Sequence, residues 1–313
     1  MAMEKVLQLA KLVPAGEAAL RDRYEVFPFY EAPDREEWVN AHGAAVRAVV
    51  TSGHDGLSND LADRLPALGI IAISGVGYDR IDLERARRKG YRVTNTPDVL
   101  TDDVADAGIG MMIMAMRNFQ AAGQYLRDGR WPNEGDLPLA SKVSGKRYGI
   151  YGLGRIGEAI AARLNGFGGS ISYSSRAPKA VPYRYYATVL ALAEASDVLF
   201  VAAAALPETR GIINQAVLDA LGPQGFLVNM SRGALVDEPA LVSALRDGRI
   251  AGAGLDVFAA EPHVPHELFS LPNVALTPHL GSATMAAREA MAQVMVSNLE
   301  AFFANRPLPT PVV

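Results

Sequence analysis

Three polar residues in the last third of the chain have the types that proton and anion chemistry needs. Arg232, Glu261 and His279 each stand in or just after a turn that follows an apolar, β-type run. The carboxyl ends of parallel strands meet at one edge of a sheet, so we expect the three side chains to gather there. Each alone is more often a structural residue. Grouped in three successive strand-end loops, they favour catalysis.

This trio suits hydride transfer to a 2-keto acid. Arginine presents a planar fork that matches a carboxylate and can polarise a carbonyl. Histidine can supply the proton as hydride reaches the carbonyl carbon, and take it back in the oxidation. A nearby carboxylate stabilises the imidazolium form of that histidine.

A glycine loop lies between an apolar run at 149–151 and an alanine-rich helical run at 158–164. Gly152, Gly154 and Gly157 have the spacing G-x-G-x-x-G. The first allows a tight turn, the second lets the backbone approach a pyrophosphate, and the third lets the helix pack close to the strand. A glycine loop alone is a weak signal, but a strand before it and a helix after it favour a dinucleotide site. The expected contacts are Gly152, Leu153, Gly154, Arg155, Ile156 and Gly157.

The second strand of this unit ends in residues that indicate the type of nicotinamide cofactor. NAD-binding units place an acidic residue about 20 positions past the glycines, where it binds the ribose hydroxyls. This chain has Ser174, Ser175 and Arg176 there instead. Serine can donate to a 2′-phosphate and arginine can pair with it, so we expect NADP(H) to be favoured over NAD(H). The alternative is that Arg176 is only a solvated surface residue.

Composition excludes several classes of protein. The 313 residues carry a net charge of −4 and no basic block, which argues against nucleic-acid binding. The absence of cysteine excludes disulfides, thiolate catalysis and cysteine zinc sites, and we expect no metal site. The N-terminus does not resemble a secretory signal, and the apolar stretch 107–116 is too short to cross a membrane. We expect a soluble, cytoplasmic protein of two domains.

Strands and helices alternate along the chain, which predicts parallel sheets covered on both faces. The first unit should have strands at 6–10, 25–29, 46–51, 70–74 and 92–95, with helices at 16–23, 35–41, 58–67 and 83–89. The second should have strands at 149–151, 170–174, 197–203, 225–230, 252–257 and 273–276, with helices at 189–194, 215–220 and 238–247. Three further segments are expected: a long helix at 102–117, a turn-rich arm at 129–145, and a closing helix at 283–305.

These motifs together identify the sequence as a member of the D-isomer-specific 2-hydroxyacid dehydrogenases. The resemblance covers nearly the whole chain, and its most specific segments are 152–157, 229–237, 254–262 and 277–282. It implies a Rossmann cofactor domain, residues 99–282, inserted in a flavodoxin-like substrate domain, residues 1–98 plus 283–313. Both are doubly wound α/β domains. It also implies a cleft between the domains and a homodimer.

The resemblance also implies roles for single residues. Arg232, Glu261 and His279 are the catalytic trio, and Val76 and Gly77 offer backbone amides to the substrate carboxylate. Asp256 would hold the nicotinamide carboxamide. The remaining cofactor contacts that it implies are Ala203, Pro207, Thr209, Met230, His279 and Gly281.

Within the family, segment 94–101 and the Ser-Ser-Arg sequence look most like the glyoxylate/hydroxypyruvate reductases. We therefore expect reduction of a small 2-keto acid to the D-2-hydroxy acid. The alternatives are another member of the same fold (D-lactate, phosphoglycerate, formate or phosphite dehydrogenase) or a nicotinamide-sensing, corepressor-like binding protein. One segment departs from the family pattern, since 202–204 is all alanine and offers few polar contacts to the nicotinamide.

Overall fold

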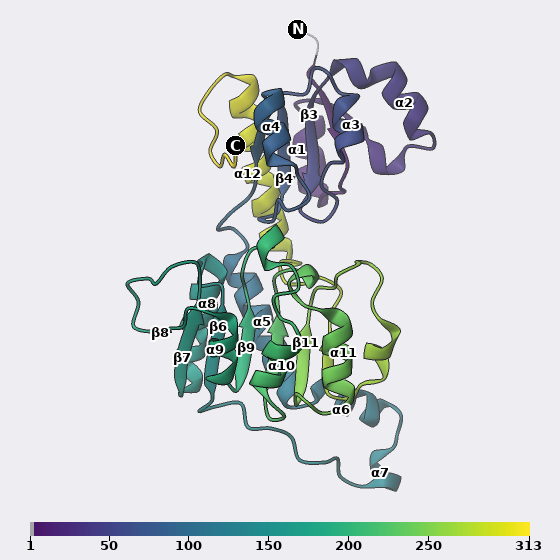
Figure 1. Ribbon diagram of the computed structural model, residues 1–313. Coiled ribbons are helices and arrows are strands. Elements are labelled where there is room, and N and C mark those ends of the chain that lie inside the picture. The colour runs from purple at the N-terminus through teal and green to yellow at the C-terminus, as the bar shows by residue number, and fades with distance from the viewer. Residues whose placement is uncertain (1–2) are drawn as a thin grey trace. The chain divides into compact units, whose positions relative to one another are not determined.

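The computed structural model describes residues 3–313, which form two compact units (Figure 1). Unit 1 comprises the described part of Met1–Leu100 together with Ala283–Val313, and unit 2 is Thr101–Ser282. Each is an α/β unit built on one parallel sheet, as the sequence predicts. Within residues 3–313, every helix is too short or too polar to span a lipid bilayer. The predicted domain limits, 1–98 plus 283–313 and 99–282, stay a prediction.

The sheet of unit 1 has the strand order β2-β1-β3-β4-β5, which is the flavodoxin-like order. Apolar runs form its central strands because both faces of a parallel sheet are buried. Its strands are β1 (Lys5–Gln8), β2 (Glu25–Pro28), β3 (Val46–Ser52), β4 (Ile70–Ser74) and β5 (Arg92–Thr94). Its helices are α1 (Pro14–Arg21), α2 (Arg35–His42), α3 (Asn59–Asp63), α4 (Leu83–Lys89) and α12 (Met285–Phe303).

Two apolar clusters cover the two faces of this sheet. On one face, Leu20 of α1 and Leu299 of α12 pack against Val6, Val50 and Ile70 of the strands. The other face packs against α3, α4 and the Leu57 loop. The predicted helix 58–67 ends at Asp63 instead, because Pro66 has no N–H to continue it.

The sheet of unit 2 has the order β12-β11-β10-β9-β6-β7-β8. Its strands are β6 (Arg147–Tyr151), β7 (Ser170–Ser174), β8 (Arg184–Tyr185), β9 (Val198–Val201), β10 (Phe226–Asn229), β11 (Gly252–Leu255) and β12 (Val274–Leu276). Strand order reverses at β6, which is the Rossmann arrangement. The sequence predicts six of these strands and misses β8, since two residues carry no pattern.

Helices cover both faces of this second sheet (Figure 1). One face packs against α9 (Val189–Glu194), α10 (Gln215–Leu221) and α11 (Glu238–Arg246). The other packs against α5 (Thr101–Met116), which also contacts α8 (Arg155–Leu164). The predicted turn-rich arm contains α7 (Trp131–Glu134) and follows α6 (Phe119–Arg127).

The turn from β6 into α8 depends on close backbone contact at Gly157. A Cβ added there would lie 2.1 Å from the carbonyl oxygen of Gly152. Close packing of this kind leaves no side chain that could move aside, so the helix itself would have to shift.

We therefore expect Gly157→Ala to lower the free energy of unfolding by about 1–3 kcal/mol through overpacking. The matched control is Gly166→Ala, because a Cβ at Gly166 meets nothing within 4 Å. Denaturant unfolding of both variants tests the contact. Equal stability of the two variants would contradict it.

Candidate active site

A buried carboxylate organises the loop that follows β12. Asp256 comes directly after β11 and is only 2% exposed. Its Oδ1 accepts hydrogen bonds from the hydroxyl of Thr277 at 2.6 Å and the amide of Leu280 at 2.7 Å, and its Oδ2 accepts one from the amide of Gly281 at 2.8 Å. Its backbone carbonyl accepts a fourth from the amide of His279 at 2.8 Å. Asp256 thus holds the loop on both sides of that histidine.

His279 has a left-handed backbone, with φ at +54°. Few residues other than glycine adopt this conformation, and it costs of order 1 kcal/mol or more unless the surroundings impose it. The bonds to Asp256 impose it here. The backbone of His279 is therefore fixed by tertiary contacts.

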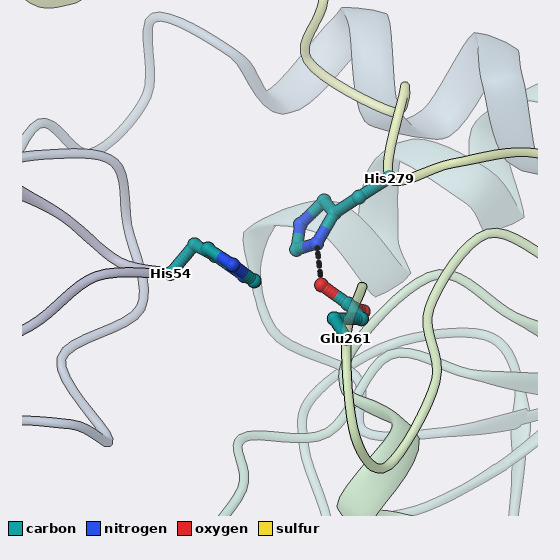
Figure 2. Close-up of side chains that lie close together, drawn as sticks. All are labelled: His54, Glu261 and His279. Atoms are coloured by element: carbon teal, nitrogen blue, oxygen red, sulfur yellow. Dashed lines mark hydrogen bonds and ion pairs between the residues drawn. The ribbon is translucent and has the colours of Figure 1, made fainter. Parts of the chain in front are cut away.

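The side chain of His279 is hydrogen-bonded to Glu261 (Figure 2), with Nδ1 and Oε2 2.7 Å apart. The other carboxylate oxygen of Glu261 accepts from the amide of Phe258 at 2.9 Å, which fixes its direction. The Glu261 side chain is 12% exposed and that of His279 is 36% exposed. With the carboxylate at Nδ1, the remaining ring nitrogen, Nε2, is the atom that can exchange a proton with a ligand.

Arg232 lies in the loop after β10, and two contacts hold that loop. The buried side chain of Asn229 donates to the carbonyl of Arg232 at 3.0 Å and accepts from the amide of Ser231 at 3.1 Å. Gly233 lies so close to the neighbouring loop that a Cβ there would be 1.9 Å from the carbonyl carbon of Phe258. The Arg232 loop therefore packs directly on the turn that orients Glu261, at the carboxyl edge of the sheet.

The glycine loop has the form that a dinucleotide needs. Gly152 has a φ of +98° and packs against Ala203, where a Cβ would lie 2.4 Å from the backbone. Leu153 is buried, whereas a Cβ at Gly154 would meet nothing within 4 Å. Helix α8 begins at Arg155, so the N–H groups of its first turn, which the helix itself does not use, follow this opening directly. The loop thus offers a backbone surface and a helix N-terminus to a pyrophosphate.

The end of β7 carries hydroxyl and cationic groups. Ser174 is buried, and the hydroxyl of Ser175 donates to the carbonyl of Ala177 at 2.8 Å. Arg176 is exposed. Lys179 forms an ion pair with Glu158 of α8, with 2.7 Å between Nζ and Oε1.

The remaining predicted cofactor contacts lie in the loops after β9, β10 and β12. The hydroxyl of Thr209 accepts from the amide of Leu206 at 2.8 Å, in the short turn that includes Pro207. The carbonyl of Ala203 accepts a hydrogen bond from Ser231. A Cβ at Gly281 would lie 3.3 Å from the Met230 side chain and 3.1 Å from Oδ2 of Asp256. These loops contact one another at the same edge of the sheet.

Residues 109–281 match the family model described as "D-isomer specific 2-hydroxyacid dehydrogenase, NAD binding domain". The chain belongs to this family. A hydroxyphenylpyruvate reductase from Plectranthus scutellarioides is 48% identical, and a glyoxylate/hydroxypyruvate reductase A from Arabidopsis thaliana is 46% identical. Both alignments cover 98% of this chain and of the relative.

Solved structures agree with the family. The NADPH-dependent glyoxylate/hydroxypyruvate reductase of Sinorhizobium meliloti, in complex with NADP and malonate, is 42% identical. It has a TM-score of 0.91 over 100% of this chain and 97% of its own. A 2-hydroxyacid dehydrogenase from Ketogulonicigenium vulgare is 44% identical, with a TM-score of 0.92 over 100% and 99% of the two chains.

In unit 1 of this dehydrogenase, Val76 and Gly77 follow β4, where the sequence predicts substrate amides. The roles of the predicted site residues stay predictions. What the structure adds is that Glu261 and His279 are in direct contact, and that the Arg232 loop is packed on the same turn.

Sequence reasoning missed Glu238. Its carboxylate accepts from the amide of Ala259 at 2.7 Å, next to the amide that binds Glu261. Burial, and then the charge of Glu261, raise the pKa of Glu238 above its ordinary value of 4.5. Glu238 directly follows the N-cap of α11, where acidic residues are common for helix stability alone, so the sequence gives no separate signal for its contact with Ala259.

A raised pKa means that the folded protein binds this proton more tightly than the unfolded chain. The resulting stabilisation is complete below pH 4.5 and is lost as pH rises through the folded-state pKa. We therefore expect the Tm of Glu238→Gln, relative to wild type, to increase as pH is raised from about 4 toward neutrality. Thermal unfolding across that range tests this. The exposed Glu267→Gln is the control, and a flat difference for Glu238→Gln would refute the expectation.

Proposed function

We propose that this chain reduces small 2-keto acids, glyoxylate and hydroxypyruvate, to D-2-hydroxy acids, with NADPH preferred over NADH. The observation that carries the proposal is the hydrogen bond between Glu261 and Nδ1 of His279, on a loop fixed by Asp256. That arrangement is suited to delivering one proton from Nε2 to a carbonyl oxygen.

Each residue of the proposed site has its own role in the reduction. A reduced nicotinamide, when bound, supplies the hydride. Residues of the chain supply the proton, polarise the carbonyl and bind the substrate carboxylate. His279 gives its proton to the carbonyl oxygen, while Glu261 holds the ring in place by its hydrogen bond to Nδ1. Arg232 polarises the carbonyl, and its two-pronged geometry also suits the substrate carboxylate. The amides of Val76 and Gly77 would bind that carboxylate.

Several residues fit the cofactor. The loop 152–157 and the start of α8 would hold the pyrophosphate, as the opening at Gly154 favours. Asp256 would accept from the nicotinamide carboxamide, since a carboxylate has acceptor positions beyond the three used within the loop. Ala203, Pro207, Thr209, Met230 and Gly281 would line the same site.

The preference for NADPH rests on the end of β7. Ser174, Ser175 and Arg176 stand where an acidic residue would bind the ribose of NAD. None of these three positions carries a carboxylate that would repel a 2′-phosphate, and Arg176 can pair with it. The Sinorhizobium relative, described as NADPH-dependent, supports this reading.

The relatives also supply a second candidate substrate class. The Plectranthus relative is named for hydroxyphenylpyruvate, a bulkier keto acid. The proton chemistry would be the same, so a substrate comparison separates the two. The homodimer and the cytoplasmic location predicted from the sequence stay predictions.

The test measures initial rates of reduced-nicotinamide oxidation with NADPH and NADH against glyoxylate, hydroxypyruvate and 4-hydroxyphenylpyruvate. We expect the highest kcat/KM with NADPH and the two small acids. Preference for NADH would contradict the proposed cofactor preference but not the proposed reduction of 2-keto acids. No turnover with any acid would overturn the proposal.

We expect His279→Gln to lower kcat at least about 100-fold, because general acid catalysis is lost, while NADPH still binds with a measurable Kd. Fluorescence titration measures that Kd. His266→Gln, another histidine of unit 2, is the matched control and should keep wild-type turnover. A near-normal rate in His279→Gln would exclude it as the acid.

A further inference from the structure

The loop that would bind the substrate carboxylate is held by the segment just after β5. Thr96 donates its amide to the carbonyl of Gly75 at 2.9 Å, and its hydroxyl accepts from the amide of Gly75, also at 2.9 Å. Asn95 donates its side-chain amide to the carbonyl of Val76 at 2.8 Å. Asn95 is 9% exposed and Thr96 is fully buried, so water competes little for these bonds.

These bonds determine where two amides point. In a trans peptide the C=O and the following N–H point in opposite directions within one plane, and both peptides here are trans. Fixing the carbonyl of Gly75 on Thr96 therefore turns the N–H of Val76 away from that segment. Fixing the carbonyl of Val76 on Asn95 does the same for the N–H of Gly77. Both N–H groups are thus aimed by bonds made on the other side of the backbone.

Asn95 is itself held by a buried hydrogen-bond network that includes Thr310 and Asn298. The hydroxyl of Thr310, in the C-terminal tail, donates to the carbonyl of Asn95 at 2.6 Å. That hydroxyl accepts from the side-chain amide of Asn298 at 2.8 Å, and the side-chain oxygen of Asn298 accepts from the amide of Thr310 at 3.1 Å. Asn298 lies on α12, is fully buried, and also donates to the carbonyl of Val294 at 2.8 Å.

The tail itself is fixed on the edge of the sheet. The carbonyl of Val313 accepts from the amide of Val93 at 3.0 Å, and the amide of Val312 donates to the carbonyl of Val93 at 2.7 Å. Thr94 and Pro311 form an antiparallel bridge. Buried polar side chains that hydrogen-bond one another and the backbone, as Asn298 and Thr310 do, restrict the structure to one geometry. Asn298 is the one polar residue among the buried residues of α12, and this network accounts for it.

We infer that Asn95, supported by Thr310 of the C-terminal tail and by Asn298, is a positioning residue for the carboxylate-binding amides of Val76 and Gly77. The inference rests on the proposed function, since it concerns the same substrate. Loss of the Asn95 bond would let the peptide plane rotate and weaken carboxylate binding in the ground state and the transition state alike. Such a loss raises KM and leaves kcat nearly unchanged.

The test compares Asn95→Ala, Thr310→Val and Thr310→Ser with wild type. We expect Asn95→Ala to raise KM for glyoxylate about tenfold, as the loss of one buried hydrogen bond would. Thr310→Val should raise this KM severalfold. Thr310→Ser, which keeps the hydroxyl, should have the KM of wild type. In each case kcat should change less than about threefold and the Kd for NADPH should stay constant.

Gln8→Ala is the matched control for lost stability. Gln8 is a fully buried residue of unit 1 whose side-chain amide donates to the carbonyl of Ala10 at 2.8 Å, the same bond type as that of Asn95, and also to Oε1 of Glu17 at 2.6 Å. We expect it to lower Tm without changing KM. An equal rise of KM in Gln8→Ala, or a KM within twofold of wild type in Asn95→Ala, would overturn the inference alone. A wild-type protein that turns over no 2-keto acid would overturn the proposed function, and the inference with it.

Discussion

The site of unit 2 depends on the hydrogen bonds that converge on the buried side chain of Asp256. A carboxylate taken out of water is costly unless its oxygens are matched by donors, and here a hydroxyl and two backbone amides match them. Those amides belong to the loop that carries His279, so stabilising the charge also fixes the backbone of the histidine. Its left-handed conformation is a consequence of that arrangement.

The parallel sheet brings the other groups to the same place. The strands β10, β11 and β12 are neighbours. Asn229 ends β10, and Asp256 and Thr277 directly follow β11 and β12. Contact between these loops is tight, as the approach of Gly233 to Phe258 shows. Unit 1 has a similar arrangement, in which hydrogen bonds from the residues after β5 fix the loop after β4. In both units a polar residue at or just after a strand end holds the backbone of a neighbouring loop.

Much of this could be predicted from the sequence, because the signals are local. The G-x-G-x-x-G spacing and the alternation of strands and helices predict the two sheets, and the position of Glu261 and His279 after strands predicts that they meet. Local signals fail where distant segments decide the structure. The role of Glu238 depends on Ala259, and that of Asn95 on a loop 19 residues away and on Thr310 in the tail. Strand β8 exists because it pairs with β7, and its two residues carry no periodicity.

The most direct test of the role of Asp256 is the kcat of Asp256→Asn, measured with NADPH and glyoxylate after thermal unfolding has shown that the variant is folded. Asparagine has the same shape but replaces one acceptor oxygen with a donor that would face the N–H groups of the loop. We expect kcat to fall by about two orders of magnitude or more, as when a general acid is displaced. A folded variant with near-normal kcat would show that the Asp256 carboxylate is not what holds His279 in its working position.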